Sequence, residues 1–149
     1  MMKKLLVLNG PNLNLLGQRN EDQYGQQTLL EIEDELKEYL QRLSFHLDAF
    51  QSNHEGELID WIHSANEHYE GVIFNPGAYT HTSVALRDAI EAIDIPVIEI
   101  HISNIHNRES FRHHSYISPV ATGQVVGFGT MGYKVAAFAL VEKLNERES

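Results

Sequence analysis

Short apolar runs alternate with longer amphipathic segments along most of this 149-residue chain. Apolar or alternating runs bounded by turn residues predict strands, which we place at 5–8, 45–50, 72–74, 96–100 and 125–126. Between them, apolar side chains recur at the spacing of an amphipathic helix. This spacing predicts helices over roughly 28–43, 58–69, 82–93 and 132–145, with a short helix near 108–114.

Local signals support these elements. Thr28 stands three residues before Glu31, which is the spacing of a capping box at a helix start. Turn sequences end the first and third strands, at 9–11 and 75–77. Strands that alternate with helices in this way form parallel sheets. We therefore predict an α/β, flavodoxin-like, doubly wound fold, with helices on both faces of a five-stranded parallel sheet, in a single domain over 1–149.

The composition excludes several classes of function. A formal net charge of -10 argues against a surface for nucleic acid or anionic membranes, because both need clustered Lys and Arg. Without cysteine, the chain has no disulfides, no cysteine-ligated zinc and no thiol catalysis. The apolar run near the N-terminus is too short for a signal peptide, and no run approaches the ~20 apolar residues of a spanning helix. We expect a soluble, cytoplasmic protein.

Polar segments follow three of the predicted strands, at 9–24, 75–81 and 99–112. Ligands of open α/β sheets bind beyond the carboxyl ends of the strands, so these segments are the expected site. Arg19, Arg108 and Arg112 all fall within them. Because guanidinium groups match carboxylate geometry, their placement indicates capture of a small anion, although surface loops also carry arginines without function.

Tyr24 lies in a long loop bounded by Gly17 and Gly25. A lone loop tyrosine usually serves packing, but Arg19 and Arg108 beside it would favour its phenolate form. Lowering a tyrosine pKa from about 10 towards 7–8 requires about 3–4 kcal/mol, which two close arginines in a partly dry site can supply. Tyr24 is therefore a candidate base.

His101 ends the fourth predicted strand two residues after Glu99, so both side chains point to the same side of the sheet. A carboxylate beside the ring would orient it and keep it protonated as an acid. A satisfied histidine at a strand end is the alternative. His81, Asn12 and Asn75 follow other strands and offer hydrogen bonds to a polyol, although asparagines also serve turns.

Two further patterns carry less weight. The segment 127–132 matches the dinucleotide fingerprint G-x-G-x-x-G, but only one helix follows it, so no later strand can supply the ribose-binding acid. We predict that these glycines serve close helix-sheet packing. The histidines lack H-x-x-x-H or H-E-x-x-H spacing and have no cysteine partners. We therefore expect neither a metal nor another cofactor.

Three segments resemble, in order, the motifs of the type II 3-dehydroquinate dehydratase family. The first is Asn9–Gly17 followed by Arg19 and Tyr24-Gly25, the second is Asn75–Ser83, and the third is Glu99–Asn104 with Arg108–Ser115. The likeness covers essentially the whole chain. Three long motifs in order are far more specific than any single short pattern.

The resemblance implies dehydration of 3-dehydroquinate to 3-dehydroshikimate through an enolate, in the shikimate pathway and without a cofactor. It assigns the removal of a proton beside the ketone to Tyr24. Arg19 and Arg108 would favour the phenolate, and Arg19 would also stabilise developing negative charge. Asn12 would hold the water that stabilises the enolate.

The same resemblance implies how the reaction is completed. His101, paired with Glu99, would protonate the departing hydroxyl group. Asp88 would reach the site of a neighbouring subunit in a homo-oligomer, a dodecamer built from trimers. The backbone amides of Ile102 and Ser103 would bind the substrate carboxylate. Its hydroxyl groups would be bound by the side chains of Asn75, His81 and Arg112.

Two observations refine the assignment. A Schiff-base mechanism would need a site lysine, and no lysine lies in the three loops. Family lids often read Arg-Glu-Pro, whereas Arg19 is followed by Asn20 and Glu21, so we expect a more mobile lid that alters turnover or affinity. The alternative function is a non-catalytic flavodoxin-like module that binds a nucleotide or small anion. A biosynthetic role and a catabolic role in quinate use both stay open.

Overall fold

Parallel strands form one sheet whose carboxyl ends meet along a single edge. The computed structural model describes residues 2–18 and 25–148. Within these ranges the strands are β1 (Lys3–Asn9), β2 (Phe45–Gln51), β3 (Gly71–Asn75), β4 (Val97–His101) and β5 (Gly123–Val126). Their order is β2-β1-β3-β4-β5, and every neighbouring pair is parallel. This is the flavodoxin-like order, so the predicted fold is confirmed.

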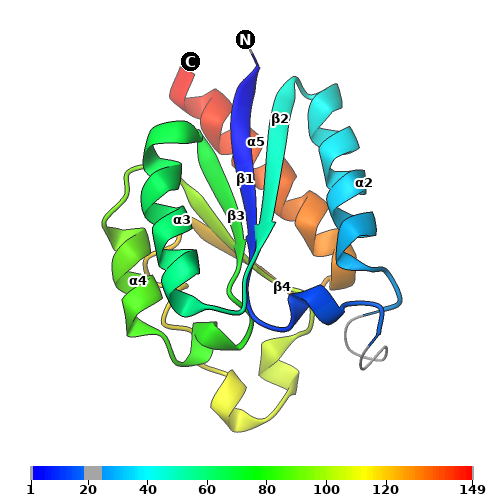
Figure 1. Cartoon of the computed structure of the whole chain (residues 1–149), viewed down its shortest axis with the longest axis vertical. Helices are drawn as coiled ribbons and strands as arrows, with labels where there is room; N and C mark the ends of the chain where they lie inside the picture. The colour runs from blue at the N-terminus through cyan, green and yellow to red at the C-terminus, as the bar shows by residue number, and fades with distance from the viewer. Residues whose placement is uncertain (1, 19–24, 149) are drawn as a thin grey trace.

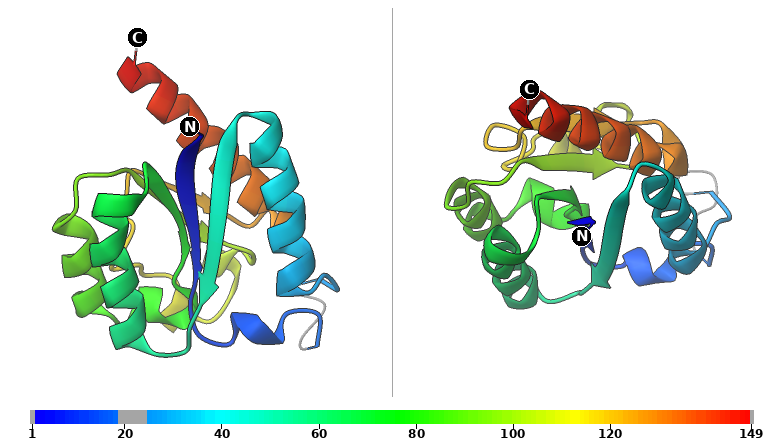
Figure 2. Two further views of the ribbon diagram at one scale, coloured as in Figure 1. Left: turned by 45° about the horizontal axis from the view of Figure 1, so that its top comes forward. Right: turned by 90° about the horizontal axis from the view of Figure 1, so that it is seen from above.

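Helices cover both faces of the sheet (Figure 1). α2 (Leu29–Arg42) and α5 (Gly132–Glu148) pack on one face, while α3 (Glu55–His68) and α4 (Val84–Glu91) pack on the other. Figure 2 shows the sheet lying between these two layers. In the described ranges, no helix is both long and apolar enough to cross a bilayer.

Short 3-10 turns occupy the connections, most of them beyond the carboxyl ends of the strands. They are η1 (Leu13–Leu15), η2 (Gly77–His81), η3 (Ile105–Asn107), η4 (Ser110–Arg112) and η5 (Gly129–Met131).

The strands are apolar because both faces of the sheet are covered. Along β1, Leu5 and Val7 pack in the core under α2 and α5, whereas Leu6 and Leu8 pack in the core under α3 and α4. Each of these side chains is at most 1% exposed, and full burial of such a side chain contributes about 1.5–3 kcal/mol. The same alternation decides on which face of the sheet the last side chain of each strand lies.

Most predicted elements are found within a few residues of their predicted bounds. The capping box is confirmed, because Thr28 Oγ1 accepts the Glu31 N–H and the Glu31 side chain accepts the Thr28 N–H. The helix predicted at 82–93 begins later, since Ser83 caps it by accepting the Leu86 N–H at 2.9 Å. The short helix predicted near 108–114 is only the turn η4.

The loops after β1 and β3 press against each other at the strand-order reversal. The Gly10 N–H donates to the Asn75 carbonyl at 2.8 Å. A Cβ on Gly10 would lie 2.5 Å from the Pro76 carbonyl oxygen, so no larger residue fits without moving backbone. This contact brings the two loops together where an α/β sheet binds its ligand.

Close packing explains only part of the glycine pattern at 127–132. A Cβ on Gly132 would lie 3.1 Å from Ile100 Cδ1, as expected for close contact between helix and sheet. Gly127 and Gly129 instead have φ values of +87° and +64°, which are left-handed conformations that favour glycine. Here the predicted reason, close packing, is incomplete.

Candidate active site

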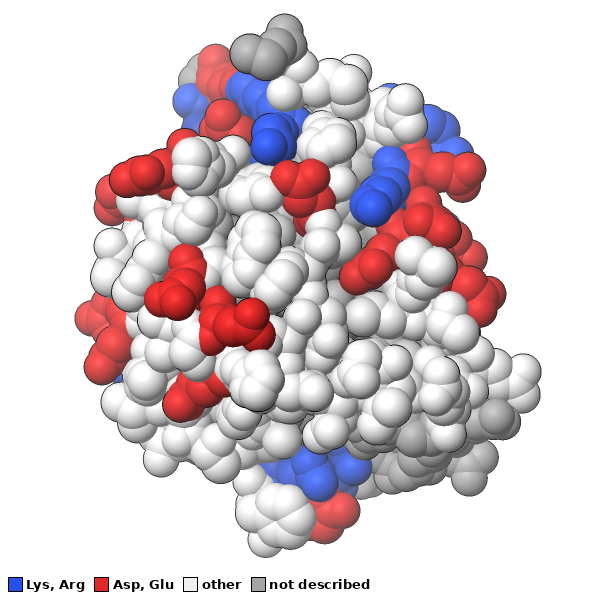
Figure 3. Space-filling model, in the orientation of Figure 1, with Lys and Arg blue, Asp and Glu red and all other residues white. Residues whose placement is uncertain are grey.

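A cavity of about 120 Å³ opens at the carboxyl edge of the sheet. Its wall comes from the loops after β1, β3 and β4, as the strand-end argument predicts. Predicted site residues that line it are Asn12, Asn75, His81, His101, Ile102, Ser103, Arg108 and Arg112. In Figure 3, acidic side chains are spread over much of the visible face, while a small basic cluster lies at its lower end, where Figure 1 shows the loops beyond the strands.

Glu99 and His101 form a buried pair at the end of β4. Glu99 Oε2 lies 2.5 Å from His101 Nε2, so the spacing of two residues places both side chains on one face. Glu99 is 0% exposed and His101 5% exposed. His101 lines the cavity, whereas Glu99 lies behind it.

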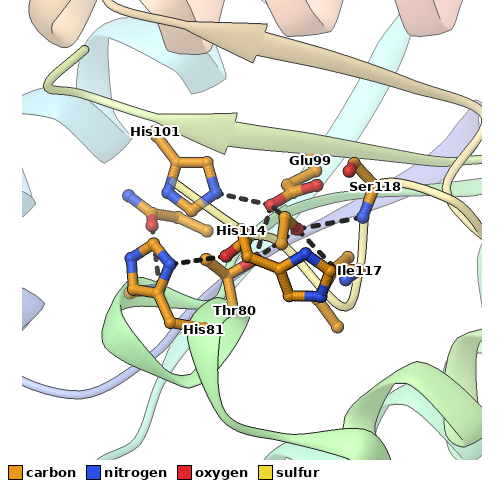
Figure 4. A network of polar contacts seen from close by, with 10 residues as sticks. Thr80, His81, Glu99, His101, His114, Ile117 and Ser118 are labelled. Carbon is orange, nitrogen blue, oxygen red and sulfur yellow. Dashed lines mark hydrogen bonds and ion pairs between the residues drawn. The ribbon is translucent and has the colours of Figure 1, made fainter. Parts of the chain in front are cut away.

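Two hydroxyl groups also bond Glu99 (Figure 4). Thr80 Oγ1 donates to Glu99 Oε2 at 2.6 Å, and Ser115 Oγ donates to the same oxygen at 2.9 Å. Burial alone would raise the pKa of Glu99, but the hydrogen bond and positive charge of His101, with both hydroxyl donors, hold that pKa below its usual value. Glu99 is therefore ionised at neutral pH.

His81 presents an acceptor to the cavity. Its Nδ1–H donates to the His114 carbonyl at 2.8 Å, which leaves Nε2 with the lone pair in the neutral ring. Burial lowers the pKa of His81, and the positive charges of His101 and Arg112 lower it further, against the raising effects of the His114 carbonyl and Glu99. A neutral His81 can accept a hydrogen bond from a ligand hydroxyl group.

Asn75 is held by a buried chain of hydrogen bonds. Its Oδ1 accepts the Gly77 N–H at 3.1 Å, and its Nδ2 donates to the Tyr133 hydroxyl at 2.9 Å. Tyr133 in turn donates to Asn9 Oδ1 at 2.6 Å. Burial raises the pKa of Tyr133 far above its usual value, so the phenol stays protonated.

Asn12 has a left-handed backbone, with φ of 69°. Its N–H donates to Asn53 Oδ1 at 3.0 Å, and the Gln51 amide donates to the Gly10 carbonyl at 3.1 Å. The loop after β2 therefore supports the loop after β1. Asparagine tolerates this conformation better than most residues.

The loop after β4 supplies positive charge and free amides. Arg108 Nη1 donates to Ser103 Oγ at 3.3 Å. Arg112 Nε donates to Glu109 at 2.5 Å, and this bond holds the pKa of the Glu109 carboxyl below its usual value. Among the residues that the structure describes, no hydrogen bond uses the Ile102 or Ser103 amide. These two N–H groups can therefore receive an anion.

Three predicted site residues are not among the described residues that line the cavity. Arg19 and Tyr24 lie outside the described ranges, as does Glu21 of the expected lid. Asp88 is exposed on α4 and does not line the cavity.

Sequence reasoning missed four residues that hold the site in place: Thr80, Ser115, Tyr133 and Asn53. Thr80 and Ser115 lie within the recognised motifs, but neither was given a role. Each of the four bonds a residue distant in the chain, and a local pattern does not indicate such a contact. Among the described residues, no three or more His, Asp or Glu side chains are grouped so that they could hold a metal ion.

Comparison with known proteins gives a consistent result. Residues 3–141 match the family model described as "Dehydroquinase class II". A protein of Bacillus cytotoxicus named 3-dehydroquinate dehydratase is 60% identical over 145 residues, which are 97% of this chain and 99% of that protein. One of Bacillus mycoides with the same name is 59% identical over equal shares of both chains.

Solved structures agree in fold. The type II dehydroquinase from Butyrivibrio crossotus has a TM-score of 0.91 and 45% identity, covering 93% of this chain and 97% of that one. The type II dehydroquinase from Propionibacterium acnes has a TM-score of 0.90 and 39% identity, covering 95% and 98%.

Proposed function

This chain belongs to the class II dehydroquinase family and is accordingly a 3-dehydroquinate dehydratase, a hydro-lyase. We propose that it removes water from 3-dehydroquinate by elimination through an enolate. One observation carries the proposal. A buried, ionised Glu99 holds His101 in the wall of a cavity that also offers guanidinium groups and free amides. A proton donor, an anion site and hydroxyl-binding groups are the parts that loss of water from a hydroxylated carboxylate requires.

The first step is removal of a proton beside the ketone, which we assign to Tyr24. The proton joins the phenolate oxygen, and the electrons of the broken C–H bond form the enolate. Arg19 and Arg108 favour the phenolate because each positive charge stabilises it. Arg19, and a water held by Asn12, stabilise the enolate oxygen.

The second step expels the hydroxyl group that is β to the ketone. His101 gives its proton to the departing oxygen, so that water leaves with the electrons of the C–O bond. The enolate electrons form the carbon-carbon double bond, and the ketone is restored in conjugation with it. Neither step needs a metal, a nucleotide or another cofactor.

We assign substrate binding to the remaining lining residues. The Ile102 and Ser103 amides receive the carboxylate, because their N–H groups have no partner among the described residues. Asn75, His81 and Arg112 bind hydroxyl groups. The neutral His81 accepts through Nε2, since its Nδ1–H is used by His114.

We also propose that 1–149 form one catalytic domain and that the chain assembles as trimers within a dodecamer. In that assembly Asp88, exposed on α4, contacts the site of a neighbouring subunit. The mass of the protein in solution tests this directly. A monomer with full activity would exclude a role for Asp88 in catalysis by another subunit.

Absorbance of the conjugated product tests the reaction. Chelator-treated protein mixed with 3-dehydroquinate should produce the ultraviolet absorbance of the enone 3-dehydroshikimate. Tyr24→Phe should abolish turnover while substrate still binds, whereas Tyr69→Phe, which alters a hydroxyl bonded to Asp48 away from the cavity, should retain it.

The same assay separates the proposal from the alternative. No product from folded wild-type protein would favour a non-catalytic module for small anions. Full turnover by Tyr24→Phe would refute the assignment of the base.

A further inference from the structure

Glu99 receives more hydrogen bonds than its pairing with His101 requires. Its Oε2 lies 2.5 Å from His101 Nε2, 2.6 Å from Thr80 Oγ1 and 2.9 Å from Ser115 Oγ. Thr80 is 0% exposed and Ser115 7% exposed. Thr80 comes from η2 and Ser115 from the segment after η4, so three separate parts of the chain converge on one oxygen.

The proton of Ser115 has a fixed direction. Ser115 Oγ accepts the N–H groups of Ile117 at 3.1 Å and Ser118 at 3.0 Å. A hydroxyl oxygen has two lone pairs, so both are occupied and only the proton remains to be placed. It faces Glu99 Oε2 and Thr80 Oγ1, and the carboxylate is the stronger acceptor.

The proton of Thr80 is directed in the same way. Because an ionised carboxylate only accepts, Thr80 must donate across the 2.6 Å contact with Glu99. The Thr80 carbonyl also accepts the Tyr116 N–H at 2.8 Å, which ties η2 to the segment that carries Ser115. Two hydroxyl donors in a buried site therefore favour the anionic form of Glu99.

This arrangement fixes which nitrogen of His101 faces the substrate. Nε2 lies against Glu99, and rotating the ring by 180° would put a carbon there and lose the hydrogen bond. Figure 4 shows the other ring nitrogen turned away from Glu99. His101 lines the cavity, so Nδ1 is the nitrogen available to a bound molecule.

We propose that Thr80 and Ser115 are positioning residues for the acid: they hold Glu99 so that it binds His101 through Nε2 and leaves Nδ1 to deliver the proton. This inference rests on the proposed function. In the second step the Nδ1–H bond breaks, its electrons stay on Nδ1, and the proton joins the departing hydroxyl oxygen. The other titratable and charged groups that line this cavity are His81, Arg108 and Arg112.

Matched substitutions at Thr80 separate the hydroxyl group from side-chain shape. Thr80→Val keeps the branched shape but removes the donor, whereas Thr80→Ser keeps the donor and loses a methyl group. We expect Thr80→Val to lower kcat by about tenfold or more, the effect of one hydrogen bond to a charged group, with little change in KM. The acid limb of its pH profile should move towards neutral pH, because Glu99 then takes up a proton more readily.

The outcomes are distinct. If the hydroxyl donor is what matters, the kcat of Thr80→Ser should stay within about twofold of wild type. A loss that came from packing alone would not shift the acid limb of the pH profile. A Thr80→Val enzyme with unchanged kcat and pH profile would falsify the inference, as would equal losses in both variants. If Thr80→Val does not fold, Ser115→Ala makes the same test, with the same expected fall in kcat and shift of the acid limb.

A spectroscopic measurement needs no variant to be active. In histidine-labelled wild-type protein, a ¹H–¹⁵N correlation spectrum across pH reports which nitrogen of His101 loses its proton, with the signal assigned by its absence from His101→Gln. We expect the neutral ring of His101 to carry its proton on Nε2, the nitrogen that lies against Glu99. Loss of the Nε2 proton first would overturn the tether even if turnover is normal, and absent turnover with the expected spectrum would reject only the proposed function.

Discussion

The buried hydroxyl group of Tyr133 should contribute strongly to stability. Its chain of hydrogen bonds begins at the Gly77 N–H, which can only donate and so fixes Asn75 Oδ1 towards itself. Asn75 Nδ2 must then donate to Tyr133, and Tyr133 must donate to Asn9. Tyr133 is 1% exposed, Asn75 3% and Asn9 0%. Tyr133→Phe keeps the ring and removes only the oxygen that both asparagines use.

The size of the effect follows from the groups left behind. Tyr133→Phe would leave Asn9 Oδ1 and Asn75 Nδ2 buried without these partners. Each such group costs about 1–3 kcal/mol, so we expect the free energy of unfolding to fall by about 2–6 kcal/mol. For a chain of this size that lowers Tm by at least about 4 °C. Because the Asn75 amide also lines the cavity, KM should rise, by about fivefold for each ~1 kcal/mol of binding lost.

Urea denaturation at a fixed protein concentration measures the first quantity, and initial rates measure the second. Tyr69→Phe is the matched control, because its hydroxyl donates to Asp48 Oδ2 from a partly exposed position. The control should lose no more than about 1.5 kcal/mol, the low end for a hydrogen bond to a charged group, because water can replace the hydroxyl group at the partly exposed Asp48 carboxylate. If Tyr133→Phe loses as little as the control, the two asparagines have other partners available and the reasoning fails.

Three further predictions concern the backbone, a helix start and pH. Gly10→Ala should unfold the site loops or lower the free energy of unfolding by over ~3 kcal/mol, because its Cβ would lie 2.5 Å from a carbonyl oxygen. Gly56→Ala in α3 is the control: its Cβ would meet nothing within 4 Å, so the free energy of unfolding should rise by about 0.5–1 kcal/mol. Urea titration measures both changes. Thr28→Ala removes the acceptor for the Glu31 N–H and should cost about 1 kcal/mol by thermal melting. The folded pKa of Glu99 lies below its ordinary value of 4.5, so its contribution to the free energy of unfolding is complete above pH 4.5 and is lost as pH falls through the folded pKa. The difference in free energy of unfolding between wild type and Glu99→Gln should therefore shrink in acid. A constant difference would contradict the depressed pKa.

The fold could be predicted because its signals are local. An apolar run such as 5–8 ends at turn residues, and the capping box of Thr28 and Glu31 marks the start of the helix that follows. The predicted bounds differ from the observed ones where a polar residue serves two purposes. Ser83 sits inside the apolar periodicity of the next helix, yet its side chain caps the Leu86 N–H and so delays the helix start.

Part of the site was predictable for the same reason. Glu99 and His101 are two residues apart on a strand, and that spacing alone places them on one face. Thr80 and Ser115 gave no such signal, because a hydroxyl group acquires its role only when folding brings it to a partner 19 or 16 residues away. Tyr133 lies 124 residues from Asn9, and a tyrosine at a buried position of a helix looks like any other core residue.

The two faces of the sheet explain why these supporting residues come from unrelated parts of the chain. Asn9 and Asn75 end their strands on the face covered by α2 and α5, so their partner, Tyr133, comes from α5. Glu99 and His101 end β4 on the opposite face, so their partners come from η2 and the segment after η4. A cavity at the edge of a sheet must be supported from both faces, because the alternation of side chains along parallel strands divides its wall between them. His101, the proposed acid, and the Asn75 amide are therefore held by different side chains on the two faces, and the two networks meet in η2, through Thr80 and Gly77. Substitution of Tyr133, on the face opposite Glu99, should therefore leave the Glu99–His101 contact intact.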